Sequence, residues 1–143
     1  NIPLTIIGDG VLKNILLDYI KDINAPVKIL SNIPNNDLSK IINNHSLYLS
    51  TSLYEGSPKT VLEAMSCGLV TVAYEAVGIN EIIVNKKNGF LTAPSPYIIS
   101  KLIKDIILDQ NRLLEISKNA RNFILKFHSY EKIIKTQNNI YFN

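Results

Sequence analysis

Two carboxylates flank a segment of this sequence that could bind an anion. Gly56 ends a polar loop that carries Glu55, and Glu63 lies about a turn and a half into a predicted helix with Ser57 as its N-cap and Pro58 as its first residue. The unpaired N–H groups of a first helical turn suit a diphosphate, and Gly56 has no side chain to block its approach. Carboxylates beside such a site can accept hydrogen bonds from sugar hydroxyls. Taken alone, however, most glutamate pairs at this spacing are solvated surface charges.

Short β-rich runs alternate along the chain with longer stretches of helical spacing. Apolar runs bounded by turn residues predict strands, and apolar residues at every third or fourth position predict helices. The expected strands are 4–7, 27–30, 46–50, 70–74 and 90–91. The expected helices are 12–23, 36–42, 57–67, 79–84, 99–106, 113–127 and a last amphipathic segment at 129–142. This alternation predicts an α/β, Rossmann-like three-layer domain with a parallel sheet, whose ligands lie where strands end, in the loops 8–10, 31–35 and 51–57.

Several motifs carry a resemblance to a known family. Glu55 and Glu63 form an E-x7-E pattern within Tyr-Glu-Gly-Ser-Pro (54–58) and Leu-Glu-Ala-Met-Ser-Cys-Gly (62–68). Further landmarks are the Gly-Asp-Gly turn at 8–10, Ile33-Pro34, and the segments 78–83, 88–91 and 127–131. With these motifs, nearly the whole chain resembles the carboxyl-terminal domain of retaining glycosyltransferases of the two-Rossmann GT-B architecture. It looks like the large glycosyltransferase family 4 (glycosyl transferases group 1).

The resemblance implies a role for each matching position. Glu55 would be the catalytic residue, which contacts the transferred sugar and stabilises its oxocarbenium-like transition state. Glu63 would bind the ribose hydroxyls of the donor nucleotide. The other donor-binding positions would be Gly56, Ser57, Pro58, Lys59 and Thr60 at the diphosphate or sugar, Ser31, Asn32 and Ile33 at the base, and Gly8 and Gly10 along the cleft. The resemblance implies no metal and no cofactor, with a nucleoside-diphosphate sugar (nucleotide sugar) as the donor substrate.

Departures from the family pattern set the expected domain limits. In the family, an Arg and a Lys that hold the diphosphate precede a segment like 4–10, and neither they nor the amino-terminal acceptor domain is present here. We therefore expect residues 1–128 to form a nucleotide-sugar-binding domain without its first strand and helix. Residues 129–143 are expected to form a carboxyl-terminal helix that packs on it or on the absent acceptor domain. This chain alone would bind its donor weakly and transfer nothing. Ser31, Val70 and Val77 stand where Gly, Pro and Gly are usual.

Composition and charge narrow the range of partners. The 143 residues are 46% hydrophobic and 19% charged, as in globular proteins, with a net charge of +3. The lysines are scattered, with Lys86-Lys87 as the one adjacent pair, which argues against nucleic-acid binding. A single cysteine, Cys67, suits a reducing compartment, and no apolar stretch approaches the roughly 20 residues of a spanning helix. We expect a cytoplasmic protein, and leave open a peripheral association of the full enzyme with the inner face of the cytoplasmic membrane.

Other interpretations stay open beside this one. The protein could be a non-catalytic partner of an active transferase, or a sugar-nucleotide 2-epimerase of the same fold. A glycoside hydrolase also uses paired carboxylates, but a phosphate-binding helix start indicates neither its acid nor its water site. The turn at 8–10 could be a plain strand-to-helix turn, and Glu81 could either contact the donor sugar or cap a short helix behind Gly78. Lys59 is expected to pair with Glu63 one turn on.

Overall fold

The computed structural model describes residues 2–141. Asn1, Phe142 and Asn143, which include the outer ends of the two expected domains, lie outside the described residues. The chain divides into two compact units, Asn1–Leu38 and Ser39–Asn143, and α2 (Asn35–Ile42) runs across their boundary. The domain limit expected at residues 128 and 129 stays a prediction. No helix within residues 2–141 is long and apolar enough to cross a membrane.

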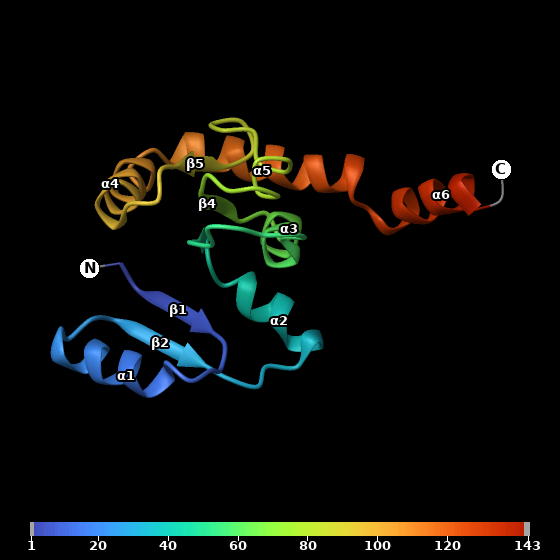
Figure 1. Cartoon of the computed structure of the whole chain (residues 1–143). Coiled ribbons are helices and arrows are strands. Elements are labelled where there is room, and N and C mark those ends of the chain that lie inside the picture. Colours follow the sequence, from blue (N-terminus) through green and yellow to red (C-terminus); the bar gives the residue numbers. More distant parts are fainter. Residues whose placement is uncertain (1, 142–143) are drawn as a thin grey trace. The chain divides into compact units, whose positions relative to one another are not determined.

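The first unit is a β-α-β segment. β1 (Leu4–Ile7) and β2 (Val27–Leu30) pair in parallel, and α1 (Lys13–Asp22) connects them (Figure 1). The paired residues are Leu4–Val27, Thr5–Lys28, Ile6–Ile29 and Ile7–Leu30. Parallel neighbours need a long crossover of this kind, which returns the chain to the same end of the sheet. Both strands therefore end at one edge, where residues 8–10 and 31–33 follow them.

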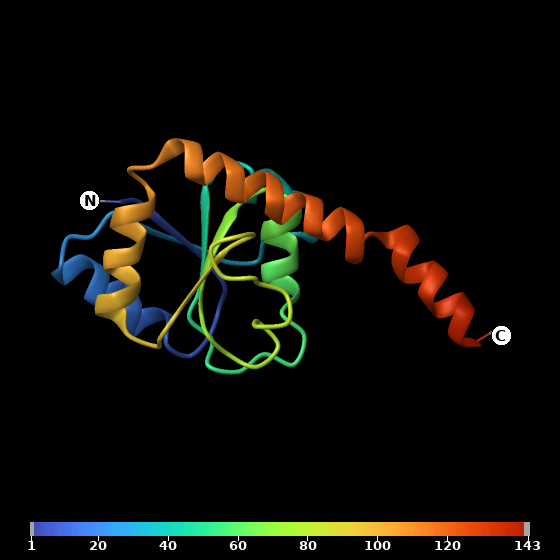
Figure 2. The same cartoon turned by 90° about the horizontal axis from the view of Figure 1, so that it is seen from above.

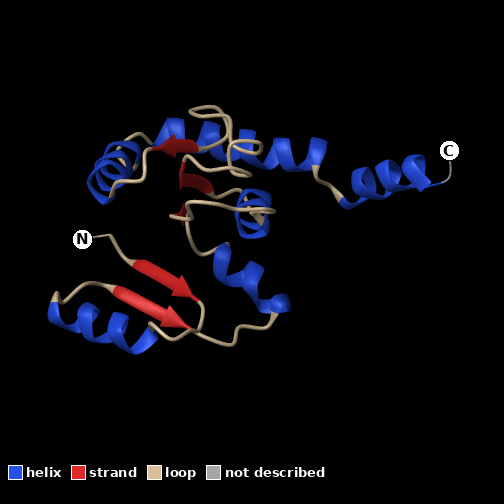
Figure 3. Cartoon of the chain, in the orientation of Figure 1, coloured by secondary structure: helices blue, strands red, loops and turns tan. Residues whose placement is uncertain are grey.

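The second unit contains a parallel sheet with the strand order β3-β4-β5 (Figure 3). Its strands are β3 (Leu47–Ser50), β4 (Val70–Tyr74) and β5 (Phe90–Thr92), with Leu47 opposite Val70 and Val72 opposite Phe90. Its helices are α3 (Lys59–Ser66), α4 (Pro96–Ile106), α5 (Gln110–Phe127) and α6 (Tyr130–Tyr141). The central strand β4 is buried along its whole length, as is typical when helices cover both faces of a parallel sheet.

Two buried clusters lie on the two faces of this sheet. Alternate residues of a strand face opposite sides, so Val70, Val72 and Tyr74 of β4 belong to one cluster and Ala73 to the other. The cluster around Ala73 packs against α3, the other packs against α4, and α5 contributes to both. Figure 2 shows α3 and α4 on opposite sides of the strands. The expected α/β fold, with parallel strands between layers of helices, is confirmed.

The helix expected at 79–84 is wrong. This segment forms turns: the Ile83 N–H still bonds to the Ile79 carbonyl at 2.9 Å, but asparagine side chains bond to backbone groups at both ends of the segment and the helix does not continue. Asn80 Oδ1 accepts the N–H of Ala76 at 3.2 Å. Asn88 Oδ1 accepts the N–H of Val84 at 2.7 Å, and Asn88 Nδ2 donates to the Ile82 carbonyl at 3.0 Å. The isoleucines of the segment are buried as their spacing predicts, although the backbone that carries them is not helical.

Candidate functional site

The loop between β3 and α3 carries Glu55, and a turn elsewhere in the second unit fixes its position. The Glu55 N–H donates to the Val77 carbonyl at 3.2 Å, and Tyr54 pairs with Val77 in a parallel bridge. Gly78 has a φ of +83°, and a Cβ atom on it would overlap the Glu55 carbonyl oxygen. A residue without a side chain is therefore needed at position 78 for the close approach that sets the backbone at Glu55.

α3 begins one residue later than the sequence suggests. Pro58 occupies the cap position with φ −78° and ψ 66°, which is not helical, so the expectation of Ser57 as cap and Pro58 as first helical residue is wrong. No side chain of the described chain caps this end. The Lys59 N–H bonds to the Ser57 carbonyl at 2.8 Å, whereas the N–H groups of Thr60 and Val61 have no intrahelical acceptor. The start of α3 can therefore donate hydrogen bonds to an anion.

The other end of α3 is anchored. A Schellman turn at Gly68, which has a φ of +80°, closes the helix through two backbone hydrogen bonds of 3.0 Å. α5 adds two side-chain contacts: Ser117 Oγ donates to the Gly68 carbonyl at 2.6 Å, and Arg121 Nη1 donates to the Ser66 carbonyl at 2.9 Å. Glu63 thus stands on a helix that is held at its carboxyl end.

The pKa of Tyr48, on β3, responds to several groups of the candidate site. Burial raises the pKa of the Tyr48 hydroxyl above its usual value, a hydrogen bond with the Thr60 side chain lowers it, and the charges of Glu55 and Glu63 raise it. Burial has the largest effect on this hydroxyl, and the two carboxylates have smaller ones. Sequence reasoning missed Tyr48 among the apolar residues of its strand. The available signal was a hydroxyl two residues before the end of the strand that leads into the 51–57 loop.

The remaining predicted residues of the second unit differ in their exposure to solvent. Most of them are exposed, namely Gly56, Ser57, Lys59, Thr60 and Glu63. Glu55 is half-buried and Pro58 is buried. The ion pair expected between Lys59 and Glu63 does not form within residues 2–141. The start of α3 therefore presents an ammonium group and two carboxylates as separate charges.

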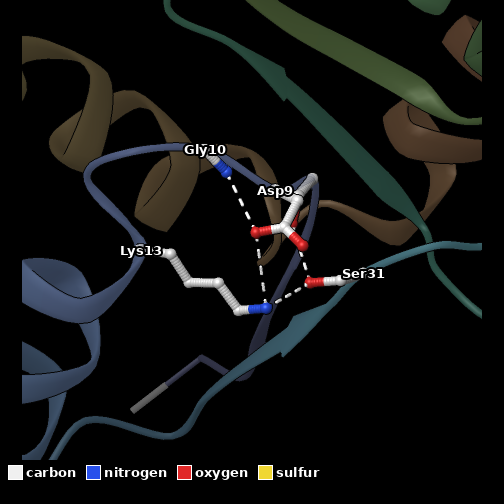
Figure 4. Close-up of polar contacts among 5 residues, drawn as sticks. Asp9, Gly10, Lys13 and Ser31 are labelled. Carbon is white, nitrogen blue, oxygen red and sulfur yellow. Dashed lines mark hydrogen bonds and ion pairs between the residues drawn. The ribbon is translucent and has the colours of Figure 1, made fainter.

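The predicted positions of the first unit follow the ends of β1 and β2. Gly8 and Ser31 are brought together, because Ser31 Oγ donates to the Gly8 carbonyl at 3.1 Å (Figure 4). Asn32 has a φ of +56°, so the chain turns sharply directly after Ser31. Ile33 is half-buried. An open cavity of about 150 Å³ borders Gly8 and Gly10.

Groupings of metal-ligating side chains are not found in the part of the chain that the structure describes. Within residues 2–141, no three His, Cys, Asp or Glu residues could hold a metal ion together. His128 packs against the Phe123 ring with the ring centroids 5.4 Å apart. That the donor is bound without a metal stays a prediction.

The chain is similar to known glycosyltransferases. The family model for Glycosyl transferases group 1 matches residues 1–123. The UDP-Gal:alpha-D-GlcNAc-diphosphoundecaprenol alpha-1,3-galactosyltransferase of Escherichia coli is 31% identical over 139 residues, which cover 95% of this chain and 35% of that enzyme. The glycosyltransferase 1 domain-containing protein 1 of Xenopus tropicalis is 28% identical over 134 residues, which cover 92% of this chain and 38% of that protein. The chain thus spans little more than a third of the length of these relatives.

Solved structures share its fold. A variant of S. aureus TarM in complex with fondaparinux, alpha-GlcNAc-glycerol and UDP matches with a TM-score of 0.86 at 25% identity, over 96% of this chain and 28% of that one. Sucrose-phosphate synthase from Thermosynechococcus elongatus matches with a TM-score of 0.88 at 19% identity, over 96% of this chain and 37% of that one, a likeness of fold alone. Since the family model covers residues 1–123 of the 143, the chain belongs to the glycosyl transferases group 1 family.

Proposed function

We propose that this chain is the donor-binding part of a retaining glycosyltransferase of family 4, which holds a nucleoside-diphosphate sugar for transfer to a glycan or lipid. One observation carries the proposal: Glu55 precedes and Glu63 follows the start of α3, where the cap residue Pro58 makes no side-chain hydrogen bond to the helix. A donor of this kind has an anionic centre with hydroxylated sugar rings on either side. Helix N–H groups suit the anion, and carboxylates suit the hydroxyls.

The diphosphate would lie against the N–H groups of Thr60 and Val61, where the helix dipole favours negative charge. A Cβ atom built on Gly56 meets no other atom within 4 Å, so the loop before the helix is open. Lys59 is exposed and could neutralise part of the charge on the leaving diphosphate. In this proposal, basic side chains and backbone amides hold the donor without a metal or cofactor.

Glu55 would act at the sugar and Glu63 at the ribose. In a retaining transfer, the bond from the anomeric carbon to the diphosphate oxygen breaks, and a bond to the acceptor oxygen forms on the same face. The acceptor hydroxyl gives its proton to the departing diphosphate. Positive charge develops on the sugar ring in the transition state, and a carboxylate fixed beside it lowers the barrier. Glu63 would accept hydrogen bonds from the ribose hydroxyls, which anchors the nucleotide.

Two relatives favour a uridine nucleotide as the donor. The TarM variant was crystallised with UDP, and the E. coli relative is named for UDP-Gal as its donor. We therefore propose a UDP-hexose donor. The acceptor of the E. coli enzyme carries diphosphoundecaprenol, which supports a lipid-linked acceptor and a cytoplasmic protein that works at the inner membrane face.

Nucleotide-dependent thermal stability of the complete protein tests donor binding. UDP at 100 times its dissociation constant should stabilise the wild type by about 2.7 kcal/mol, and Glu63→Ala should remove this gain. Glu115→Ala is the matched control, because Glu115 is an exposed glutamate of α5 outside the proposed site. GDP and ADP in parallel identify the base. No stabilisation of the wild type by any nucleotide would refute the donor-binding role.

Product stereochemistry and turnover test the chemistry. The anomeric configuration of the product, measured by NMR, should equal that of the donor. Glu55→Gln should lower kcat by about 100-fold or more, as expected for loss of a group that stabilises transition-state charge, whereas Glu115→Gln should leave it unchanged. An inverted product, or wild-type turnover in Glu55→Gln, would contradict the retaining mechanism or the role of Glu55.

A further inference from the structure

Side-chain contacts tie the turn after β1 to the end of β2. Lys13 Nζ donates to Ser31 Oγ at 2.8 Å, and Ser31 Oγ donates to the Gly8 carbonyl at 3.1 Å. Lys13 Nζ also lies 3.5 Å from Asp9 Oδ1, which accepts the N–H of Gly10 at 3.1 Å. Figure 4 shows these groups converging on the space between the two segments. Five residues from three elements thus form one connected polar network.

Lys13 is the centre of this network and stands in an unfavourable place for a cation. It is the first residue of α1, where the helix dipole disfavours positive charge. Its side chain is about one-third exposed, and its ammonium group contacts two oxygen atoms of the protein. Asp9 offsets the charge from one side, and Ser31 accepts a charge-assisted hydrogen bond on the other. The ammonium group of Lys13 therefore binds to Asp9 and Ser31, which lie in two loops of the protein itself.

The Ser31 hydroxyl both accepts and donates a hydrogen bond. The oxygen accepts from Lys13, and the hydrogen goes to the Gly8 carbonyl. The next residue, Asn32, has a φ of +56°, a conformation of which few non-glycine residues make use. The hydroxyl thus holds the chain at the point where it enters the segment 31–33. A glycine or alanine at position 31 would leave Lys13 and the Gly8 carbonyl without this link.

We propose that Lys13 and Ser31 form a latch that holds the Gly8–Gly10 turn against the Ser31–Ile33 segment, and so presets the backbone that meets the base of the nucleotide. Both are positioning residues, because they act through the backbone of these two segments. The proposal rests on the proposed donor-binding function, and deepens it by naming what fixes the base-binding segment before the donor arrives. Preset segments lose less conformational freedom on binding, which strengthens binding without a new contact to the ligand.

A double-mutant cycle in the complete protein tests the latch. Lys13→Met removes the ammonium group and keeps most of the aliphatic chain, and Ser31→Ala removes the hydroxyl alone. Each variant should weaken UDP binding about five- to tenfold, as expected for the loss of one hydrogen bond of ordinary net strength. The double variant should bind no more weakly than about tenfold, because both changes break the same link. Lys21→Met, at the exposed end of the same helix, is the matched control and should bind as the wild type does.

Hydrogen exchange supplies a readout that needs no ligand. In the nucleotide-free protein, Lys13→Met should speed exchange of the backbone amides of 31–33, and Ser31→Ala should speed exchange of those of 8–10, while melting temperatures show that the variants remain folded. With substrates present, the latch variants should raise the KM for the donor and leave kcat unchanged.

The outcomes separate the latch from the proposed function. If the wild type binds no nucleotide, the proposed function fails and the role of the latch fails with it. If the wild type binds UDP and both variants bind equally well, the latch alone is refuted. Losses that multiply in the double variant, or a loss confined to Lys13→Met, would mean that the ammonium group contacts the nucleotide directly, which also overturns the latch.

Discussion

Replacing Gly78 with alanine should displace Glu55. A Cβ atom at position 78 would overlap the Glu55 carbonyl oxygen and lie 3.0 Å from the Glu55 carbonyl carbon. Both are backbone atoms, which cannot rotate away as the end of a flexible side chain could. The loop that carries Glu55 must therefore move, and its hydrogen bond to the Val77 carbonyl must lengthen or break.

The expected magnitude follows from these contacts. The φ of +83° at Gly78 costs an alanine about 1–2 kcal/mol. Loss of the 3.2 Å bond between the Glu55 N–H and the Val77 carbonyl costs about 1 kcal/mol more. We expect the free energy of unfolding to fall by about 2–3 kcal/mol in total. A shift of about 1 Å in a group that acts on the substrate can lower turnover by about 100-fold.

Gly68→Ala is the matched control for this change. Gly68 has a φ of +80°, but the nearest atom to a Cβ there is Ser117 Oγ at 3.4 Å, an ordinary contact. The control therefore carries the backbone cost without the overlap. Urea unfolding and transfer kinetics of the complete protein should show a larger loss of stability and a much lower kcat for Gly78→Ala. Equal losses of stability in the two variants, with wild-type kcat for Gly78→Ala, would refute the reasoning.

Three further changes test other parts of the second unit. Tyr48→Phe should make the free energy of unfolding depend less on pH above about pH 9. Burial raises the pKa of Tyr48 in the folded state, so the wild type loses stability as the pH rises from the usual pKa of 10.0 toward the folded-state pKa. Urea unfolding from about pH 9 to 11 measures this slope, and an equal slope in the variant and the wild type would contradict a raised pKa at Tyr48. Ser117→Ala should lower the free energy of unfolding by about 1 kcal/mol, since it removes the bond to the Gly68 carbonyl, and unchanged urea stability would count against that anchor. Ile79→Ala should lower the free energy of unfolding by about 2–5 kcal/mol, because Ile79 is fully buried. Tyr97→Ala, at a side chain that is 75% exposed, should lower it by less than about 0.5 kcal/mol. Similar losses in the two variants would show that the turn at Ile79 is not part of the core.

The strands could be predicted from sequence because their signal is local. β1, β2 and β4 have the expected bounds, since each is a short run of mostly apolar, β-branched or aromatic residues. The segment 79–84 could not, because three isoleucines at helical spacing are equally well buried by a turn. What decides between the two is the pair of asparagines, Asn80 and Asn88, whose amides bond to the backbone. Whether an asparagine side chain replaces a helical hydrogen bond depends on which backbone groups the fold brings next to it. The spacing of apolar residues in the sequence does not reveal this.

The candidate site divides in the same way. Glu55 and Glu63 could be predicted because they stand in one linear motif. The contact of Gly78 with the Glu55 backbone could not, because it joins segments that are distant in sequence. Val77 stands where a glycine is usual, but its side chain is exposed and does not disturb the contact with Glu55, which the Val77 backbone carbonyl makes. Lys13 has a local signal, because it follows Asp9 by only four residues across the start of α1 and opposite charges so close in sequence can pair.

The two glutamates are held by unrelated means, and this bears on how the site can fail. Glu63 stands on a helix whose carboxyl end is bonded to α5 through Ser117 and Arg121. Glu55 stands on a loop whose position depends on one backbone bond and one glycine. Groups on anchored helices keep their geometry better than groups on loops. Damage to the loop contacts should therefore abolish turnover while nucleotide binding persists, whereas damage to the α3 anchor should weaken both. Catalysis in this family member would then be the property most sensitive to substitutions outside the site.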